Sequence, residues 1–239
     1  MAVAFDAVGP SSSGKTVAAG FTSPQTWSHT CTGSQLALFV AVAVGTKAPG
    51  TDADAVITGV TYAGVAMTFI GRRHSNDQTA GYIELWVLVN PATGANTVSV
   101  SITGTFANTT IEAGSTSFTG VDQSVPYNGF TSSVGNDTTP TISITSKAGD
   151  IALDVVAGGT GLTGFGVNQT NRWLANQNTL SGAGNAAQST SVGATSVSAT
   201  YTMSAGDWWA MLGVNVRAPS ALPPLQYNRK MAFQQRAAS

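Results

Sequence analysis

The clearest chemical pattern in the sequence is Gly9-Pro-Ser-Ser-Ser-Gly14-Lys15-Thr16, which matches the nucleotide-binding loop G-x-x-x-x-G-K-[ST]. In that loop, backbone amides and the lysine hold phosphate groups, and the threonine hydroxyl binds Mg²⁺. The mechanism needs a helix that begins at the lysine, because the N-terminal amides must point at the phosphates. The next residues, Val17-Ala-Ala-Gly20-Phe-Thr-Ser-Pro24, leave too little room for such a helix. We therefore interpret the match as accidental and the segment as a connector.

The remaining metal-binding and nucleophilic residue types are scattered. His29 and His74 have no neighbouring ligands at zinc spacing, and no serine lies in a G-x-S-x-G turn. Asp52 and Asp54 offer too few oxygens for Ca²⁺, which usually takes about six to eight ligands. Cys31 is the single cysteine, so an internal disulfide is excluded. We predict no metal and no cofactor.

Three carboxylates, Glu84, Asp154 and Asp207, fall in or beside segments that alternate between apolar and polar residues. A sugar hydrolase would need two of them roughly 5 to 10 Å apart across a cleft. Nothing in their spacing along the chain brings them together. We predict no catalytic residues, and a protein that is not an enzyme.

Tryptophan could provide a platform on which a sugar stacks, although large aromatic residues in β-sandwiches more often fill the core. In the adjacent pair Trp208 and Trp209, only one ring can face the core of a regular strand, which leaves the other as an interface candidate. The other tryptophans are Trp27, Trp86 and Trp173.

The elements that must position these residues are predicted to be strands. Alternation is plain in residues 82–89, 96–102 and 196–203, where one face is apolar and the other carries mainly Ser and Thr. Closely spaced strands between Gly, Pro, Asn and Asp turns predict an all-β fold, an antiparallel β-sandwich that is jelly-roll-like. The low-complexity stretch 180–194 is predicted to be a mobile loop or a contact loop. The predicted strands are 2–7, 26–31, 36–44, 56–62, 66–72, 82–89, 96–102, 114–118, 141–145, 150–157, 170–177, 196–203 and 208–217.

Composition narrows the function classes. The 239 residues include 42% hydrophobic types and 27 glycines, which excludes a wholly disordered chain and implies many turns. Only 9% of residues are charged and the net charge is −1, so no basic field favours nucleic acid or an anionic membrane as a partner. The longest apolar run, 36–44, is too short to cross a bilayer as a helix. The N-terminus lacks the pattern of a signal peptide, so we expect synthesis in the cytoplasm.

The domain prediction is a sandwich over residues 1–218, in which 1–55 supply less specific N-terminal strands. From Pro219 the composition changes to a Pro-rich linker, and residues 219–239 form a basic C-terminal arm that needs a partner surface. The interface residues predicted in this arm are Tyr227, Arg229, Lys230, Met231, Phe233 and Arg236.

Four strings support a family resemblance over roughly residues 56–218. They are Ser117-Phe-Thr-Gly-Val-Asp-Gln123, Gly149-Asp-Ile-Ala-Leu-Asp-Val-Val-Ala157, Gln169-Thr-Asn-Arg-Trp173 and Asp207-Trp-Trp-Ala-Met-Leu-Gly-Val-Asn-Val216. They resemble a β-sandwich domain of tailed-bacteriophage virion structural proteins, which also occurs in bacterial surface proteins.

The resemblance implies a decoration, neck, tail or fibre protein that is located in the virion and has no catalytic residues to carry over. Its partners would be other virion proteins and further copies of itself, and symmetry allows a homotrimer. The alternative hypothesis is a glycan-binding module that recognises the host surface through exposed Trp and Tyr rings.

Overall fold

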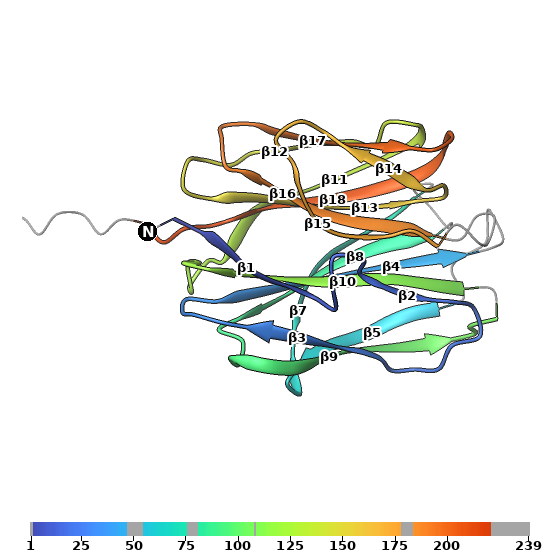
Figure 1. Ribbon diagram of the computed structural model, residues 1–239, viewed down its shortest axis with the longest axis horizontal. Coiled ribbons are helices and arrows are strands. Elements are labelled where there is room, and N and C mark those ends of the chain that lie inside the picture. Colours follow the sequence, from blue (N-terminus) through green and yellow to red (C-terminus); the bar gives the residue numbers. More distant parts are fainter. Residues whose placement is uncertain (1, 47–54, 76–80, 108, 178–183, 221–239) are drawn as a thin grey trace, which may run out of the picture.

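The computed structural model describes residues 2–46, 55–75, 81–107, 109–177 and 184–220. Every regular element in these ranges is a β-strand, and every strand pair is antiparallel (Figure 1). The predicted all-β, antiparallel sandwich is therefore confirmed. Its sheets divide between an N-terminal and a C-terminal half of the chain.

The N-terminal half contains two sheets. Its inner sheet has the order β1 (Ala4–Gly9), β10 (Thr109–Thr119), β4 (Ala37–Thr46), β8 (Tyr82–Val89) and β7 (Thr68–His74), with the short β2 (Lys15–Val17) also on β10. Its outer sheet has the order β3 (Gln25–Cys31), β9 (Gly94–Gly104), β5 (Ala55–Tyr62) and β6 (Val65–Ala66).

The C-terminal half repeats this plan. Its inner sheet has the order β11 (Tyr127–Asp137), β18 (Asp207–Val216), β13 (Ile151–Gly158), β16 (Asn185–Val192) and β15 (Thr170–Ala175). Its outer sheet has the order β12 (Thr141–Ile144), β17 (Val197–Met203) and β14 (Leu162–Phe165).

The strand orders of the two halves correspond position by position. The inner order β1-β10-β4-β8-β7 matches β11-β18-β13-β16-β15, and the outer order β3-β9-β5 matches β12-β17-β14. In each half the first strand pairs with the last, and the next two pairs nest inside it: β3 with β9 and β4 with β8 in the N-terminal half, β12 with β17 and β13 with β16 in the C-terminal half. This nesting is typical of a jelly roll. The body predicted over residues 1–218 thus contains two sandwiches of one topology.

A shared β-bulge supports this correspondence. The strings Ile57-Thr-Gly59 and Leu162-Thr-Gly164 each interrupt the register at the threonine. The Thr58 hydroxyl donates to the carbonyl of Ser101 at 3.2 Å, and the Thr163 hydroxyl donates to the carbonyl of Thr202 at 3.2 Å. The same local sequence therefore produces the same kink at the same place in both halves.

The sheets stack as four layers with three apolar cores between them (Figure 1). The central core joins the two inner sheets, and its members come from both halves, including Phe39, Leu85, Leu153 and Leu212. The first outer core lies between the sheets of the N-terminal half, and the second outer core between those of the C-terminal half. Both inner sheets are therefore covered on two faces, which explains why β4 and β18 read as near-continuous apolar runs.

One predicted loop is wrong. Residues 185–192, placed in a loop by the sequence analysis, form β16 between β13 and β15, and all but Val192 of them are buried. Its Ala, Ser and Thr side chains are small enough to fit between two packed sheets but give no clear apolar alternation. Strands β2, β11 and β14 were likewise not predicted, and residues 221–239 of the predicted arm lie outside the described residues.

Candidate functional site

A row of aromatic and charged side chains crosses the edge of the inner sheet in the N-terminal half. Three alternate cross-strand pairs form it: Phe69 opposite Trp86, Arg72 opposite Glu84, and His74 opposite Tyr82. We call these six residues the β7–β8 ladder. Alternation along β8 puts its three members on one face, and a bulge between Phe69 and Gly71 brings the β7 members into register with them.

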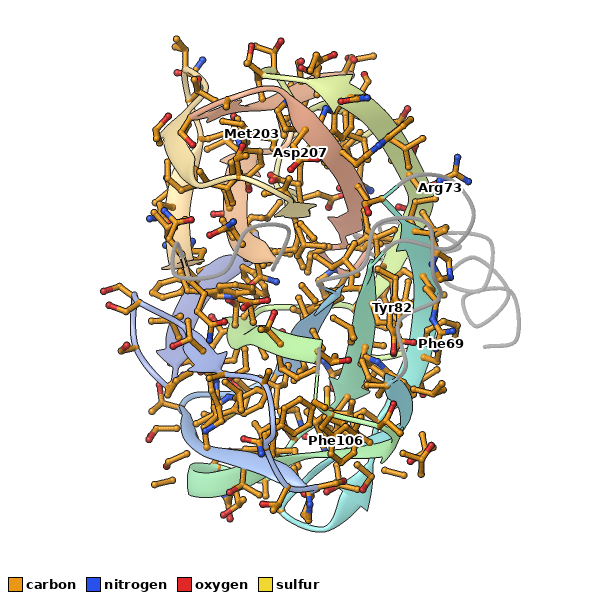
Figure 2. All side chains as sticks on the ribbon, turned by 90° about the vertical axis from the view of Figure 1, so that its right-hand side faces the viewer. Phe69, Arg73, Tyr82, Phe106, Met203 and Asp207 are labelled. Atoms are coloured by element: carbon orange, nitrogen blue, oxygen red, sulfur yellow. The ribbon has the colours of Figure 1, made fainter. Side chains whose placement is uncertain are left out.

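The aromatic end of the ladder is open to solvent. Phe69 is 46% exposed, and its ring lies 5.1 Å from the Trp86 ring with an interplanar angle of 62°. At the other end Tyr82 is buried. Its hydroxyl donates to the carbonyl of Ala55 at 2.9 Å and accepts from the amide of Ile57 at 3.2 Å, which ties this end of the ladder to β5. Figure 2 labels Phe69 and Tyr82 on this edge of the molecule.

The centre of the ladder is an ion pair. Arg72 Nε donates to Glu84 Oε1 at 2.7 Å, and Trp86 Nε1 donates to Glu84 Oε2 at 2.8 Å. The Arg72 guanidinium also lies 4.3 Å from the centre of the Tyr82 ring. Burial raises the pKa of Glu84, and the charge and hydrogen bonds of Arg72 offset this in part. Glu84 therefore acts as an anchor that fixes the plane of a guanidinium whose side chain is 33% exposed.

The carboxylates considered for sugar hydrolysis do not meet. Glu84 lies in the ladder, whereas Asp154 lies between the sheets of the C-terminal half, where it accepts from Ser189 at 2.7 Å and from Tyr201 at 2.5 Å. Burial raises the pKa of Asp154 to about 6. Asp207, on β18, lies against Gly159. In the described part of the chain no group of three or more His, Cys, Asp or Glu side chains could hold a metal ion.

A buried hydrogen-bond network contains the residue types of a hydrolytic triad, Ser, His and Asp, but they are bonded to one another in a different order. His29 bonds the hydroxyl of Ser115 through Nδ1 at 2.9 Å and that of Ser117 through Nε2 at 2.9 Å, while Asp6 accepts from Ser117 at 2.7 Å. In a triad the carboxylate would instead orient the histidine. The ring is 1% exposed, and burial lowers its pKa to about 4. The network therefore satisfies polar groups inside the first outer core.

The structure places a strand where a phosphate-binding loop would begin a helix. Lys15–Val17 form β2, which pairs with Ile111–Ala113 of β10. The connector predicted over residues 9–16 is thus partly wrong, because Lys15 and Thr16 belong to a strand of the inner sheet. No helix N-terminus is available at Lys15 to receive a phosphate.

Nucleotide binding gives a direct check. We expect titration calorimetry with ATP and Mg²⁺ to show no heat of binding for the unaltered chain. Lys15→Ala should leave the melting temperature within about 1 °C, because Lys15 is only half-buried and belongs to none of the three apolar cores. Micromolar ATP binding that is lost in Lys15→Ala would contradict this interpretation.

The tryptophans divide as strand alternation predicts. Trp209 is 4% exposed, and its Nε1 donates to Asp137 at 3.2 Å, whereas Trp208 is 43% exposed. The prediction that only one of the pair faces inward is confirmed, and an interface role for Trp208 stays a prediction. Trp27 and Trp173 are buried, so of the earlier candidates only Trp86 belongs to the ladder. Sequence analysis missed Phe69 and Arg72 because the bulge in β7 hides their common face.

A small pocket of about 160 Å³ lies in the C-terminal half. Its polar side chains mostly bond one another: Asn215 donates to Asp150 at 2.8 Å and to Asn128 at 2.9 Å. It is well below the roughly 300 Å³ at which ligand pockets begin. The ladder is therefore the better candidate site. The other residues that line the pocket are Thr145, Ser146, Lys147 and Arg217.

Comparison of the chain with protein-family models, curated proteins and solved structures finds no match. In the ranges that the structure describes, no helix is long and apolar enough to cross a membrane.

Proposed function

We propose that this chain is a structural component of a bacteriophage virion, of the decoration, neck, tail or fibre kind. It assembles with other virion proteins and with further copies of itself through its surface and residues 219–239. The resemblance of the strings around Ser117, Asp154 and Trp209 to phage β-sandwich domains supports this assignment.

The observation that carries the proposal is how the buried polar side chains are used. His29 is held between two serines, Asp154 between Ser189 and Tyr201, and the indole of Trp173 donates to Gln188 at 2.9 Å. Histidine and aspartate can act in catalysis in other proteins, but these side chains hold one strand against another. A double sandwich reinforced in this way suits a protein that must keep its shape in a particle.

The direct test is quantitative mass spectrometry of virions purified from cells that express the chain. We expect a fixed number of copies per particle that survives washing in high salt. A chain that is absent from purified particles but abundant in the lysate would overturn the proposal.

Truncation tests how the chain is incorporated. We expect deletion of residues 219–239 to leave the melting temperature of the body within about 2 °C, because so short a segment has little stability of its own. Incorporation into particles, or oligomerisation measured by light scattering, should be lost. The double variant Arg229→Ser/Lys230→Ser removes two charges of the arm but keeps its length, so it separates the effect of charge from the effect of length. Normal assembly of the truncated chain would contradict the predicted arm.

A second function, recognition of host glycans, is favoured by the ladder alone. It is compatible with the first, because a virion surface protein can present a sugar-binding site.

A further inference from the structure

We infer that the β7–β8 ladder binds a pyranose ring of an uncharged polysaccharide. This inference goes beyond the structural role proposed above, and it holds whether or not the chain is part of a virion. It rests on three features of the ladder: an open aromatic surface, a guanidinium with donors to spare, and the balance of charge between Arg72 and Glu84.

The first feature is an aromatic pair in which Phe69 is exposed and Trp86 is half-buried against the first outer core. Phe69 on the edge strand and Trp86 on its neighbour contact each other at 5.1 Å, and Phe69 leaves 46% of its surface in water. An aromatic face carries negative charge, and the C–H groups of a sugar ring are slightly positive. A pyranose packed on this surface would remove apolar area from water while its hydroxyl groups stay free to hydrogen-bond.

The second feature is the fixed guanidinium beside the rings. Glu84 Oε1 accepts a hydrogen bond from Arg72 Nε at 2.7 Å and also contacts Nη2. Within the described residues no other acceptor bonds this guanidinium, which leaves N–H groups that can donate to a ligand. The Tyr82 ring lies against the guanidinium at 4.3 Å, and Tyr82 is itself tied to β5 through its hydroxyl. The donors are therefore preorganised, which reduces the entropy lost when a sugar hydroxyl accepts from them.

The third feature decides the class of sugar. Glu84 is only 1% exposed in its side chain and neutralises the charge of Arg72. A site that pairs its one arginine internally offers little attraction to phosphate or uronate groups, which favour unpaired basic residues. Neutral hexoses are the ligands that fit this balance.

The test uses the full chain and a panel of neutral, uronic-acid-containing and sialylated oligosaccharides, followed by titration calorimetry with the best neutral ligand. We expect neutral ligands to bind and Phe69→Ala to weaken binding about tenfold, which corresponds to the loss of one aromatic contact. Arg72→Lys keeps the charge but removes the planar donors, so it should weaken binding to a similar extent. Phe5→Ala is the matched control and should bind as the unaltered chain does, because it removes a 39% exposed ring from β1, at the opposite edge of the same inner sheet.

Each outcome bears on the inference. Melting curves separate lost binding from lost folding, because Phe69 is exposed and its replacement should not lower the melting temperature by more than about 2 °C. Absence of binding to every neutral oligosaccharide, preference for acidic sugars, or unchanged binding in Phe69→Ala would each overturn it. None of these results alters the expected copy number in purified particles, so the two proposals fail independently.

Discussion

Replacing Trp173 with alanine should lower the free energy of unfolding by about 3–5 kcal/mol, the usual cost of removing a large buried aromatic side chain. The ring belongs to β15 of the C-terminal half, but it packs over Gly114 of β10 in the N-terminal half. Its Nε1 also donates to Gln188 at 2.9 Å, and Gln188 in turn accepts from Thr116 of β10. The substitution therefore opens a cavity and removes a hydrogen bond at the junction of the two halves.

Urea denaturation monitored by circular dichroism measures this effect. Trp208→Ala is the matched control, because that ring is 43% exposed and should cost less than about 1 kcal/mol. Gly114→Ala tests the same contact from the opposite side, because a side-chain carbon there would clash with the Trp173 ring. If Trp173→Ala were as mild as Trp208→Ala, the halves would not be joined through this ring.

The second large effect concerns pH. Glu112 lies opposite Ala43 on the face of β10 that meets the C-terminal half, and neither of its carboxylate oxygens has a hydrogen-bond partner in the described residues. Burial raises the pKa of Glu112 well above its usual range, and the nearby Thr110 hydroxyl lowers it only slightly. The folded protein therefore holds this carboxyl group neutral where an unfolded chain would ionise it, at a pKa of about 4.3.

The sign of the effect follows from this difference. Below about pH 4.3 both states are protonated and the contribution of Glu112 to stability is fully present; it is lost as pH rises through the raised folded pKa. The contribution of Glu112 to the free energy of unfolding should fall by about 1.4 kcal/mol per pH unit within that window. Asp154, whose pKa is about 6, and Glu84 add smaller losses of the same sign. His29, whose pKa burial lowers to about 4, adds a gain of the opposite sign up to the usual histidine pKa of about 6.5.

Glu112→Gln should remove the largest part of this dependence. We expect the variant to match the unaltered chain at pH 4 and to melt several degrees higher at pH 8, as followed by calorimetry across that range. Asp154→Asn is the comparison variant, because its carboxylate accepts two hydrogen bonds that an amide cannot fully replace. The comparison is made between the two chains, because His29, whose pKa is lowered to about 4, stabilises the fold as pH rises over part of the same range. A difference in melting temperature between Glu112→Gln and the unaltered chain that does not grow from pH 4 to pH 8 would contradict the prediction.

Local alternation predicted those strands whose one face is clearly apolar. Residues 82–89 were predicted with the bounds of β8, and 197–203 lie within the predicted strand 196–203. Strand β16 was missed because its Ala, Ser and Thr side chains give no periodic contrast, although they are buried between two sheets. Strand β11 was missed because it is an edge strand without a buried residue, so no apolar face marks it in the sequence. The repeat of topology was missed as well, because strand order depends on contacts far apart along the chain.

The candidate site shows the same limit. Glu84 and Trp86 could be singled out from residue type and alternation, but their partners across the strand could not. The bulge between Phe69 and Gly71 shifts the phase of β7 by one residue, so that Phe69 and Arg72 share a face despite their odd spacing. The two indoles at 208 and 209, by contrast, followed simple alternation.

Because one chain contains both sandwiches, dilution of the protein does not separate them. Only residues 120–126 separate the last strand of the N-terminal half, β10, from the first strand of the C-terminal half, β11. A tether this short keeps the two inner sheets at an effective concentration on the order of millimolar or more, whereas a dimer of separate sandwiches would dissociate as it is diluted. Because the junction is intramolecular, its two sides are also free to differ: β15 turns Trp173 into the central core, while β7, the corresponding strand of the other half, leaves Phe69 46% exposed.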